Sequence, residues 1–392
     1  MFEPTLISDT LRSQWIAPGD VFSVLLILGG DVVARALAQL AGGGLTPVAF
    51  SFGWVTYAIS ALGQERLMVQ DSDTECKIIN GQTGYTRSNT SWVLGRLMRD
   101  FKYWRGAETN EIVEEVLDQK WGELKRKNAG QPAPARPTHA GLVVTIYQPS
   151  TTHESGVPVR DGLYWSGIGV LVLQLGIAAI PFGLFGDWGI LMITAAGIFL
   201  SLLTGSLPEW RREKWACRTN SPETYILTGG NGNQHAIVVL GNKRGLNLED
   251  LAAGQRNIET TTDHSTRATL LILATLWVLL LITAAGLKTN PWFLLAVGAV
   301  GMVQKICVST WRRRPENFGI PLEFVEVIGR PKVMETLTEV ERRYPKVGRS
   351  MLPEFFPGKL RPGEVAIWEQ LERDAQVTKN STEKHPRTQT VS

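Results

Sequence analysis

The sequence predicts an all-α transmembrane bundle of about six helices in three hairpins, with a small α+β cytosolic domain assembled from the connections and the tail. The 392-residue chain has a mean hydropathy of −0.02. Its apolar residues, however, are concentrated in six nearly uncharged stretches of roughly 17 to 22 residues, each able to cross a hydrocarbon core about 30 Å thick as a helix. The stretches come in pairs, and the turn within each pair is too short to form a domain.

The three predicted hairpins occupy separate parts of the chain. The first pairs 21–41 with 46–62, the second pairs 164–185 with 188–207, and the third pairs 268–286 with 291–310. Because each hairpin returns the chain to the face that it left, both termini and both long connections are expected on one face. The resulting order, from a cytosolic N-terminal segment to a disordered tail, is 1–20, 21–62, 63–163, 164–207, 208–267, 268–310, 311–377 and 378–392.

The basic residues predict which face is cytosolic. Of the 40 Lys and Arg residues, Lys288 lies in a tight turn and Arg35 and Lys305 lie within spans, which leaves 37 on the face with the termini. Basic residues beside helix ends favour the cytosolic side. We therefore expect a multi-pass membrane protein with both termini cytosolic. Tryptophans at the span ends are typical of an interfacial belt: Trp165, Trp188, Trp210, Trp292 and Trp311.

Strand-like segments in the connections and the tail predict the small α+β domain. Six of them are rich in β-branched or alternating apolar residues: 76–80, 83–87, 141–148, 224–228, 235–241 and 322–328. A turn at Gly81-Gln82 separates the first two segments, and GGNGNQ separates 224–228 from 235–241, as in hairpins. A helix is expected after Asn110, where acidic residues favour its start. None of these pieces can hold a core alone, so we expect them to assemble into one domain.

The segment 91–105 (SWVLGRLMRDFKYWR) is basic and amphipathic. Its apolar residues fall on one side of a helix, and four basic residues occupy the rest. Two interpretations stay open: the segment lies on the anionic cytosolic leaflet, or it packs against the cytosolic domain.

The first span differs from the others because it carries ionisable residues. Asp31, Arg35 and Gln39 recur every four positions and therefore form one polar stripe along a helix. A second stripe consists of small residues, which let another helix approach closely: Gly30, Ala34, Ala38 and Gly42. A charge near the bilayer centre costs about 2.5 to 3.5 kcal/mol, and intramembrane ionisable residues are functional candidates by default.

Three interpretations of this stripe remain open. Asp31 and Arg35 form a functional site, or they neutralise each other as a structural clasp, or the helix is broken at Gly29-Gly30 and leaves the pair near an interface. In the functional case Asp31 and Arg35 are the candidate catalytic residues, and the candidate ligand-binding residues are Gln39, Ser51, Trp54 and Tyr57. In the sixth span, Lys305 lies within snorkelling distance of the cytosolic face, so we interpret it as an anchor.

The sequence lacks the motifs of soluble-type catalysis. The five histidines form no HxxH or HxxxH pair, so no metal site is predicted. There is no GxxxxGK[ST] loop and no GxSxG elbow. No cofactor is expected. The net charge of +3 is too small for a nucleic-acid partner.

Four strings carry a resemblance to a known group of proteins: GGDVVARALAQLAGG (29–43), TPVAFSFGWVTYAISAL (46–62), KIINGQTGYTRSNTSWVLGRLMRD (77–100) and GGNGNQHAIVVLG (229–241). They resemble uncharacterised multi-pass membrane proteins of filamentous fungi over most of residues 20–250. The resemblance implies a fungal protein of the endoplasmic reticulum or another endomembrane, with a secondary-metabolite pathway as its setting. It implies no activity and no catalytic residue.

Three functional hypotheses follow. The first is a polytopic membrane protein that binds, moves or scaffolds a lipophilic small molecule or a partner. The second is a membrane-embedded enzyme of isomerase or cyclase type, in which Asp31 donates or accepts a proton and Arg35 holds its charge state. The third is a structural interaction protein. The expected partners are membrane lipid, a lipophilic small molecule and other membrane proteins.

Overall fold

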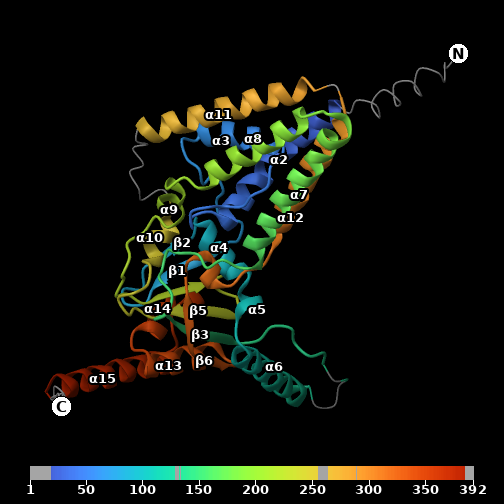
Figure 1. The fold of residues 1–392 in the computed structure, drawn as a ribbon. Helices are drawn as coiled ribbons and strands as arrows, with labels where there is room; N and C mark the ends of the chain where they lie inside the picture. Colours follow the sequence, from blue (N-terminus) through green and yellow to red (C-terminus); the bar gives the residue numbers. More distant parts are fainter. Residues whose placement is uncertain (1–18, 129–131, 133, 255–263, 288, 385–392) are drawn as a thin grey trace, which may run out of the picture. The chain divides into compact units, whose positions relative to one another are not determined.

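The computed structural model describes residues 19–128, 132, 134–254, 264–287 and 289–384, with side chains for all of these except 19–28 and 376–384 (Figure 1). The described residues form two compact units, each assembled from three separate stretches of chain. The helical unit draws on Met1–Asp71, Gly156–Ala216 and Gln255–Gly319. The sheet unit draws on Ser72–Ser155, Cys217–Gly254 and Ile320–Ser392.

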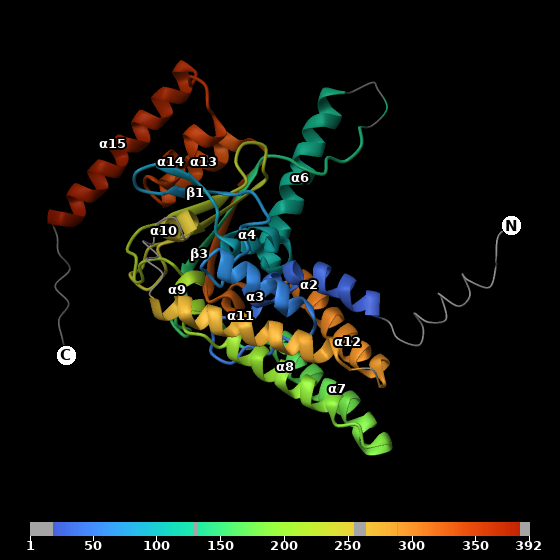
Figure 2. The ribbon, with the colours of Figure 1, turned by 90° about the horizontal axis from the view of Figure 1, so that it is seen from above.

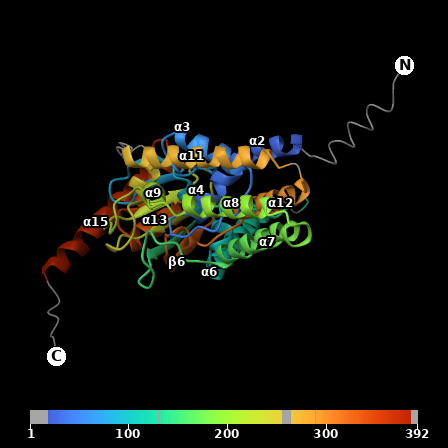
Figure 3. The ribbon, with the colours of Figure 1, turned by 45° about the horizontal axis from the view of Figure 1, so that its top comes forward.

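The helical unit contains three helices that are long and apolar enough to cross a membrane, counted over the described residues: α7, α11 and α12. A fourth apolar helix, α8, is shorter. Figures 2 and 3 show α7 beside α8, and α3 beside α11. The helices of this unit are α2 (Gly19–Leu40), α3 (Gly53–Gly63), α7 (Gly162–Phe185), α8 (Gly189–Gly205), α9 (Glu209–Lys214), α11 (His264–Ala285) and α12 (Pro291–Thr310).

The second and third predicted hairpins correspond to α7–α8 and α11–α12. Gly186 ends α7 in a left-handed conformation, with φ of 70°, and donates its backbone N–H to Phe182. Asp187, in the same turn, accepts hydrogen bonds from Thr289 (2.8 Å) and Asn290 (3.3 Å) of the other turn. The two turns therefore lie at one end of the helical unit. Lys288, which we assigned to a tight turn, lies outside the described residues.

The predicted second span, 46–62, is not one helix. Residues 46–52 have no regular secondary structure, and α3 that follows is only 11 residues long. We call 46–52 the inserted segment. Glycines of the neighbouring helices leave room for it: a Cβ atom at Gly301 would collide with the Phe50 carbonyl, and one at Gly197 would collide with the Phe50 ring. Gly197 and Gly205 of α8 therefore both face this segment; a Cβ at Gly205 would lie 2.8 Å from Thr46.

The prediction of the first hairpin is also wrong, because α2 runs in the opposite direction to the one expected. Two basic side chains at the ends of other helices donate to the carbonyls at the end of α2. Lys214, which follows α8, donates to the Ala41 carbonyl at 2.8 Å. Arg313, which follows α12, donates to the Gln39 carbonyl at 2.5 Å. The end of α2 therefore lies at the basic end of the unit, which we define as the end where α8 and α12 finish. Gly29 of α2 lies beside Met302 of α12, so the first residues of α2 lie toward the opposite end of the unit.

The chain also leaves α3 at the basic end. The backbone N–H groups of Leu67 and Met68 donate to the Glu213 carboxylate at 3.1 and 2.6 Å. Glu65 forms an ion pair of 3.3 Å with Arg267 at the start of α11. Thr46, where the inserted segment begins, donates its hydroxyl to the Gly205 carbonyl at 2.7 Å. Residues 46–63 thus enter and leave the helical unit from the same end.

The sheet unit is a six-stranded sheet flanked by helices. Its strand order is β2-β1-β4-β5-β3-β6, and every neighbouring pair is antiparallel except β3 and β5. All six strand-like segments predicted from the sequence enter this sheet. Its strands are β1 (Lys77–Asn80), β2 (Thr86–Ser88), β3 (Leu142–Pro149), β4 (Tyr225–Thr228), β5 (His235–Val239) and β6 (Leu322–Arg330). Its helices are α4 (Trp92–Arg99), α5 (Phe101–Trp104), α6 (Ala107–Lys127), α10 (Leu248–Ala253), α13 (Val333–Arg343), α14 (Val347–Phe355) and α15 (Pro362–Lys384).

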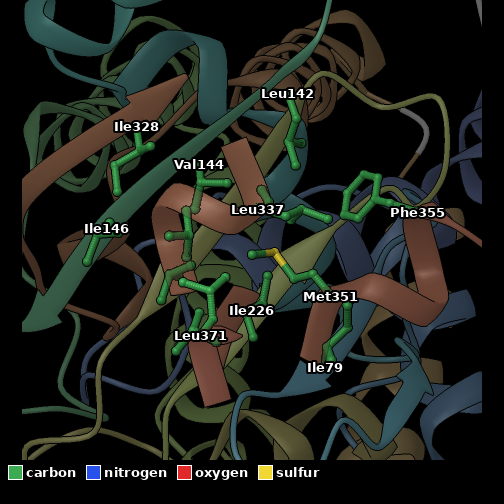
Figure 4. Close-up of a cluster of buried hydrophobic side chains, with 14 of the residues drawn as sticks. Ile79, Leu142, Val144, Ile146, Ile226, Ile328, Leu337, Met351, Phe355 and Leu371 are labelled. Carbon is green, nitrogen blue, oxygen red and sulfur yellow. The ribbon is translucent and has the colours of Figure 1, made fainter. Parts of the chain in front are cut away.

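Alternation along the strands gives the sheet two buried faces. On one face, side chains such as Val144 and Ile146 pack against Leu337 of α13, Met351 of α14 and Leu371 of α15 (Figure 4). On the other face, Val143 packs against three buried apolar residues of α6 and against the partly buried Ile112. Helix α15 includes residues 378–384 of the tail that we expected to be disordered, and residues 385–392 lie outside the described residues.

The amphipathic segment 91–105 forms α4 and α5 and packs inside the sheet unit. Trp92 and Leu97 are buried, and so is the basic Arg96. The Arg96 guanidinium lies 4.5 Å from the centre of the Trp92 ring and 3.0 Å from the Asp73 carboxylate. With its apolar side used in this way, the segment has no apolar face left for a lipid leaflet. The packing interpretation is therefore favoured.

Candidate functional site

The polar stripe of α2 does not form an enclosed site. Asp31 and Arg35 form an ion pair of 3.0 Å, with side chains that are 63% and 39% exposed. Within the described residues they bond only to each other. The pair therefore neutralises itself along one helix, as the clasp interpretation expects, but it does not tie α2 to a neighbouring helix.

Gln39 is separated from the other candidate residues. It is fully buried at the basic end, where its Nε2 donates to the Trp311 carbonyl at 2.9 Å. Its Oε1 has no hydrogen-bond donor among the described residues. Lys214 and Arg313 lie around it, bonded to the carbonyls of Gln39 and Ala41.

These two buried cations cap α2. Carbonyls at a helix C-terminus lack partners within the helix and carry partial negative charge, so cations stabilise them. Arg313 also forms an ion pair of 2.8 Å with Asp161, the residue that caps the start of α7. Burial lowers the pKa of Lys214 well below its usual value, and the nearby Arg313 guanidinium lowers it further. This cluster fastens the ends of three helices and encloses no pocket among the described residues.

Ser51, Trp54 and Tyr57 are buried together around the inserted segment. Trp54 donates its indole N–H to the Ala49 carbonyl at 2.9 Å, and Tyr57 donates its hydroxyl to the Leu67 carbonyl at 2.8 Å. The rings of Trp54 and Tyr57 meet edge to face, with centres 5.7 Å apart. The structure thus brings three of the six sequence-predicted site residues together, without Asp31, Arg35 or Gln39.

Two glutamines from apolar helices satisfy the backbone of the inserted segment. Gln174 of α7 accepts from the Phe50 N–H at 3.2 Å and donates to the carbonyls of Phe50 and Val297, each at 2.8 Å. Gln304 of α12 accepts from the Ala49 N–H at 3.3 Å and donates to the Pro47 carbonyl at 3.4 Å. Backbone groups that lack helical partners need such substitutes in an apolar environment.

Lys305 of α12 is not an interfacial anchor, contrary to our expectation. It is fully buried, and its Nζ donates to the Ala49 carbonyl at 3.3 Å and to the Ser51 hydroxyl. The Nζ lies 5.9 Å from the centre of the Trp54 ring. Among the described residues, no carboxylate lies within ion-pair distance of it. Lys305 points inward because it lies on the side of α12 that packs on the inserted segment.

A small aromatic pocket lies beside these residues. Phe50, Ser51, Phe52 and Val55 line one side, and Trp277 with its neighbours on α11 lines the other. The cavity itself is small, about 10 Å³, and is partly open to the surroundings. Trp277 stacks on the rings of Trp54 and Phe50, with centres 5.3 and 6.2 Å apart. Ser51 and Trp54 were predicted from the sequence, but Trp277 was not, because a tryptophan within an apolar stretch gives no distinctive signal.

The sheet unit has one further polar cluster that the sequence analysis missed. Arg105 lies 2.9 Å from His235 Nε2, and the ring of His235 meets Phe101 at 5.4 Å. Burial and the neighbouring Arg105 charge lower the pKa of His235 to about 4. The histidine is therefore neutral at pH 7. Its Nδ1 has no partner among the described residues.

Within the described part of the chain, no group of three or more His, Cys, Asp and Glu residues is arranged to hold a metal ion. The chain matches no protein-family model, no curated protein and no solved structure.

Proposed function

We propose that this chain is a multi-pass membrane protein whose helical unit binds a lipophilic small molecule in the aromatic pocket beside the inserted segment. The observation that carries the proposal is the non-helical backbone of 46–52, which is buried among apolar helices and lines this pocket. At membrane depth, irregular backbone is tolerated only where protein buries it or where it lines a cavity, and interrupted helices often form substrate sites in transport proteins.

Exposed side chains support a membrane setting for the helical unit. Large apolar residues such as Leu173, Phe199 and Ile282 are more than half exposed, as expected where the neighbour is lipid. Exposed tryptophans lie at both ends, among them Trp311 at the basic end and Trp188 at the opposite end. The 20 residues of α12 separate these ends by about 30 Å, the thickness of a hydrocarbon core.

For the membrane topology, we propose five crossings and one re-entrant segment. Helices α2, α7, α8, α11 and α12 cross, while 46–63 enters and leaves at the basic end. Arg211, Arg212 and Arg312 flank helix ends there, so the positive-inside tendency assigns this end to the cytosol. The sheet-forming segments follow helix ends at the same end, which assigns the sheet unit to the cytosol. The start of α2 then lies on the opposite side, in place of the expected arrangement with both termini cytosolic.

An endomembrane location and a fungal secondary-metabolite setting are the parts of the proposal that rest on resemblance alone. Binding without covalent catalysis is favoured over the enzyme hypothesis, because Asp31 lies exposed and outside the pocket. The bound molecule is then moved through the helical unit or held for a partner protein.

Photolabelling tests the proposed binding site. Membranes containing the full chain are incubated with a C16 alkyl diazirine, irradiated and digested, and labelled peptides are identified by mass spectrometry. We expect labelling within 50–55 and 276–284 that excess unlabelled C16 lipid removes. Labels confined to exposed side chains such as Leu173 and Phe199, and insensitive to competitor, would show lipid contact without a site and would refute the proposal.

A further inference from the structure

The ion pair of Asp31 and Arg35 on α2 is a charged surface in an apolar setting. Its two side chains are 63% and 39% exposed. At 1.5 Å per residue the 22-residue helix is about 33 Å long, and Asp31 lies about 13 Å from its last residue, Leu40. With α2 crossing the membrane as proposed, the exposed pair therefore lies within the hydrocarbon core.

A charged pair at this depth needs a polar neighbour. Ionisable residues within membrane helices rarely face lipid; they face other protein segments or water and pair with one another. The neighbouring helix α3 packs on α2 at Gly30, where a Cβ atom would lie 2.8 Å from Thr56. Asp31 and Arg35 are exposed on another side of α2, which α3 leaves uncovered. We therefore looked for a partner that fits this side.

The atoms that the pair leaves unused are complementary to one another. Within the part of the chain that the structure describes, the pair has one hydrogen bond, from Arg35 Nε to Asp31 Oδ2 at 3.0 Å. A guanidinium has five N–H donors, so the four on Nη1 and Nη2 remain, and Asp31 Oδ1 remains as an acceptor. One copy of the chain thus presents both the donors and the acceptor that a second copy requires.

We propose that two copies of this chain form a two-fold symmetric dimer in the membrane through the exposed side of α2. Arg35 of each copy keeps its Nε bond to its own Asp31 and donates through Nη1 or Nη2 to the partner's Asp31. The four charges then neutralise one another in a single network. This inference goes beyond the proposed binding function and depends only on the proposed crossing of α2.

The symmetry of such a dimer is compatible with these contacts. Copies of one membrane protein insert in the same direction, so the two-fold axis runs along the membrane normal and the same surface of each copy meets at the interface. The two α2 helices then lie side by side at equal depth. Arg35 is about 6 Å along the helix from Asp31, and since it already reaches back to Asp31 on its own helix, the partner's Asp31 lies at a depth that it can reach.

Charge reversal tests the interface. Two differently tagged copies of the full chain are co-expressed and solubilised in a neutral detergent, and the amount of one copy captured through the tag of the other is measured. Asp31→Arg leaves only positive charge on the interface, and Arg35→Asp leaves only negative charge. Because like charges that meet at an interface repel, each variant should capture its own kind at least tenfold less than the unsubstituted chain does.

Mixing the two variants supplies the decisive comparison. A chain with Asp31→Arg and a chain with Arg35→Asp carry opposite charges, so capture of one by the other should return to roughly the unsubstituted amount. Such recovery would also show that both variants fold. Arg267→Glu breaks another exposed ion pair of the helical unit, with Glu65, and should leave capture unchanged.

If a single variant does not fold, as judged by size-exclusion chromatography, two double variants decide the question. Asp31→Arg with Arg35→Asp in one chain exchanges the charges and should self-associate like the unsubstituted chain. Asp31→Leu with Arg35→Leu leaves no charge and should reduce capture at least tenfold. Unchanged self-capture in the variants would overturn the inference, and so would an unsubstituted chain that captures another protein but no copy of itself. Photolabelling of 50–55 is independent of these outcomes, so the binding proposal and the dimer can fail separately.

Discussion

The indole rings of Trp54 and Trp277 are nearly parallel, at 5°, with their centres 5.3 Å apart. Trp54 belongs to the short helix that follows the inserted segment, and Trp277 belongs to α11. The stack therefore joins a segment that lacks its own secondary structure to a helix able to cross the membrane. Offset stacking of buried rings adds to the area that they bury.

The stack predicts a large loss of stability when Trp54 is truncated. Trp54→Ala removes the ring contact and the hydrogen bond to Ala49, and we expect the free energy of unfolding to fall by about 3–5 kcal/mol. Trp188→Ala, at an exposed tryptophan of the same unit, should change it by less than about 0.5 kcal/mol. Circular dichroism during SDS titration of detergent-solubilised protein measures both. Equal losses would argue against a structural role for the stack.

Alanine substitutions at two glycines test where the inserted segment lies. A Cβ at Gly301 would collide with the Phe50 carbonyl and lie 2.8 Å from Gln174 Nε2, whereas a Cβ at Gly176 of α7 meets nothing within 4 Å. Gly301→Ala should therefore destabilise the protein by about 1–3 kcal/mol, as overpacking does. Gly176→Ala should be neutral or stabilising by up to about 1 kcal/mol, because alanine favours helix. Thermal unfolding of both variants tests this, and matching midpoints would contradict the placement of 46–52.

Hydropathy predicted those helices whose backbone hydrogen bonds are made within the helix itself. α12 has the predicted bounds, 291–310, because Pro291 stands in its first turn and an uninterrupted apolar run follows. The strand-like segments of the connections were found for a similar reason, since alternation and glycine turns are local signals. In each case the neighbouring residues in sequence determine the local structure.

The inserted segment was missed because its partners are distant in sequence. Its apolar composition resembles that of a span, but its hydrogen bonds go to Gln174 and Gln304, more than 100 residues away. Hydropathy treats these glutamines as isolated polar residues. The local signals that were available are Pro47, which lacks a backbone N–H, and the glycines at 197, 205 and 301, which leave room for a backbone. The pocket could not be predicted from these local signals, because its walls come from α11 and the inserted segment, which are distant in sequence.

The low pKa of His235 predicts acid sensitivity of the sheet unit. The histidine has a pKa of about 4 in the folded protein and about 6.5 when unfolded. As the pH falls through 6.5 the unfolded state gains a proton that the folded state does not bind, so stability decreases until the pH passes about 4. Between pH 7 and 4.5 this group should remove about 2 kcal/mol from the free energy of unfolding.

Hydrogen exchange of the β5 amides in the full chain, compared at pH 7 and pH 4.5 after correction for intrinsic rates, measures this loss. His235→Gln does not titrate and should lose less protection on acidification than the unsubstituted protein, by the same amount. An exposed histidine, His153, supplies the control, and His153→Gln should leave the pH dependence unchanged. An unaltered pH dependence in His235→Gln would mean that another group titrates.

The direction of α2 predicts on which side of the membrane each turn lies. The sequence alone placed Leu45 with the tight turn at Asp187, whereas the capping of α2 by Lys214 and Arg313 places it at the basic end. Single cysteines in a chain without Cys76, Cys217 and Cys307 separate these alternatives: Leu45→Cys and Arg314→Cys at exposed positions and Asp187→Cys at a partly exposed one. In sealed vesicles, a membrane-impermeant maleimide should label Leu45→Cys and Arg314→Cys from one side and Asp187→Cys from the other. Labelling of Leu45→Cys together with Asp187→Cys would restore the six-span hairpin arrangement, and with it the expectation that both termini share a face.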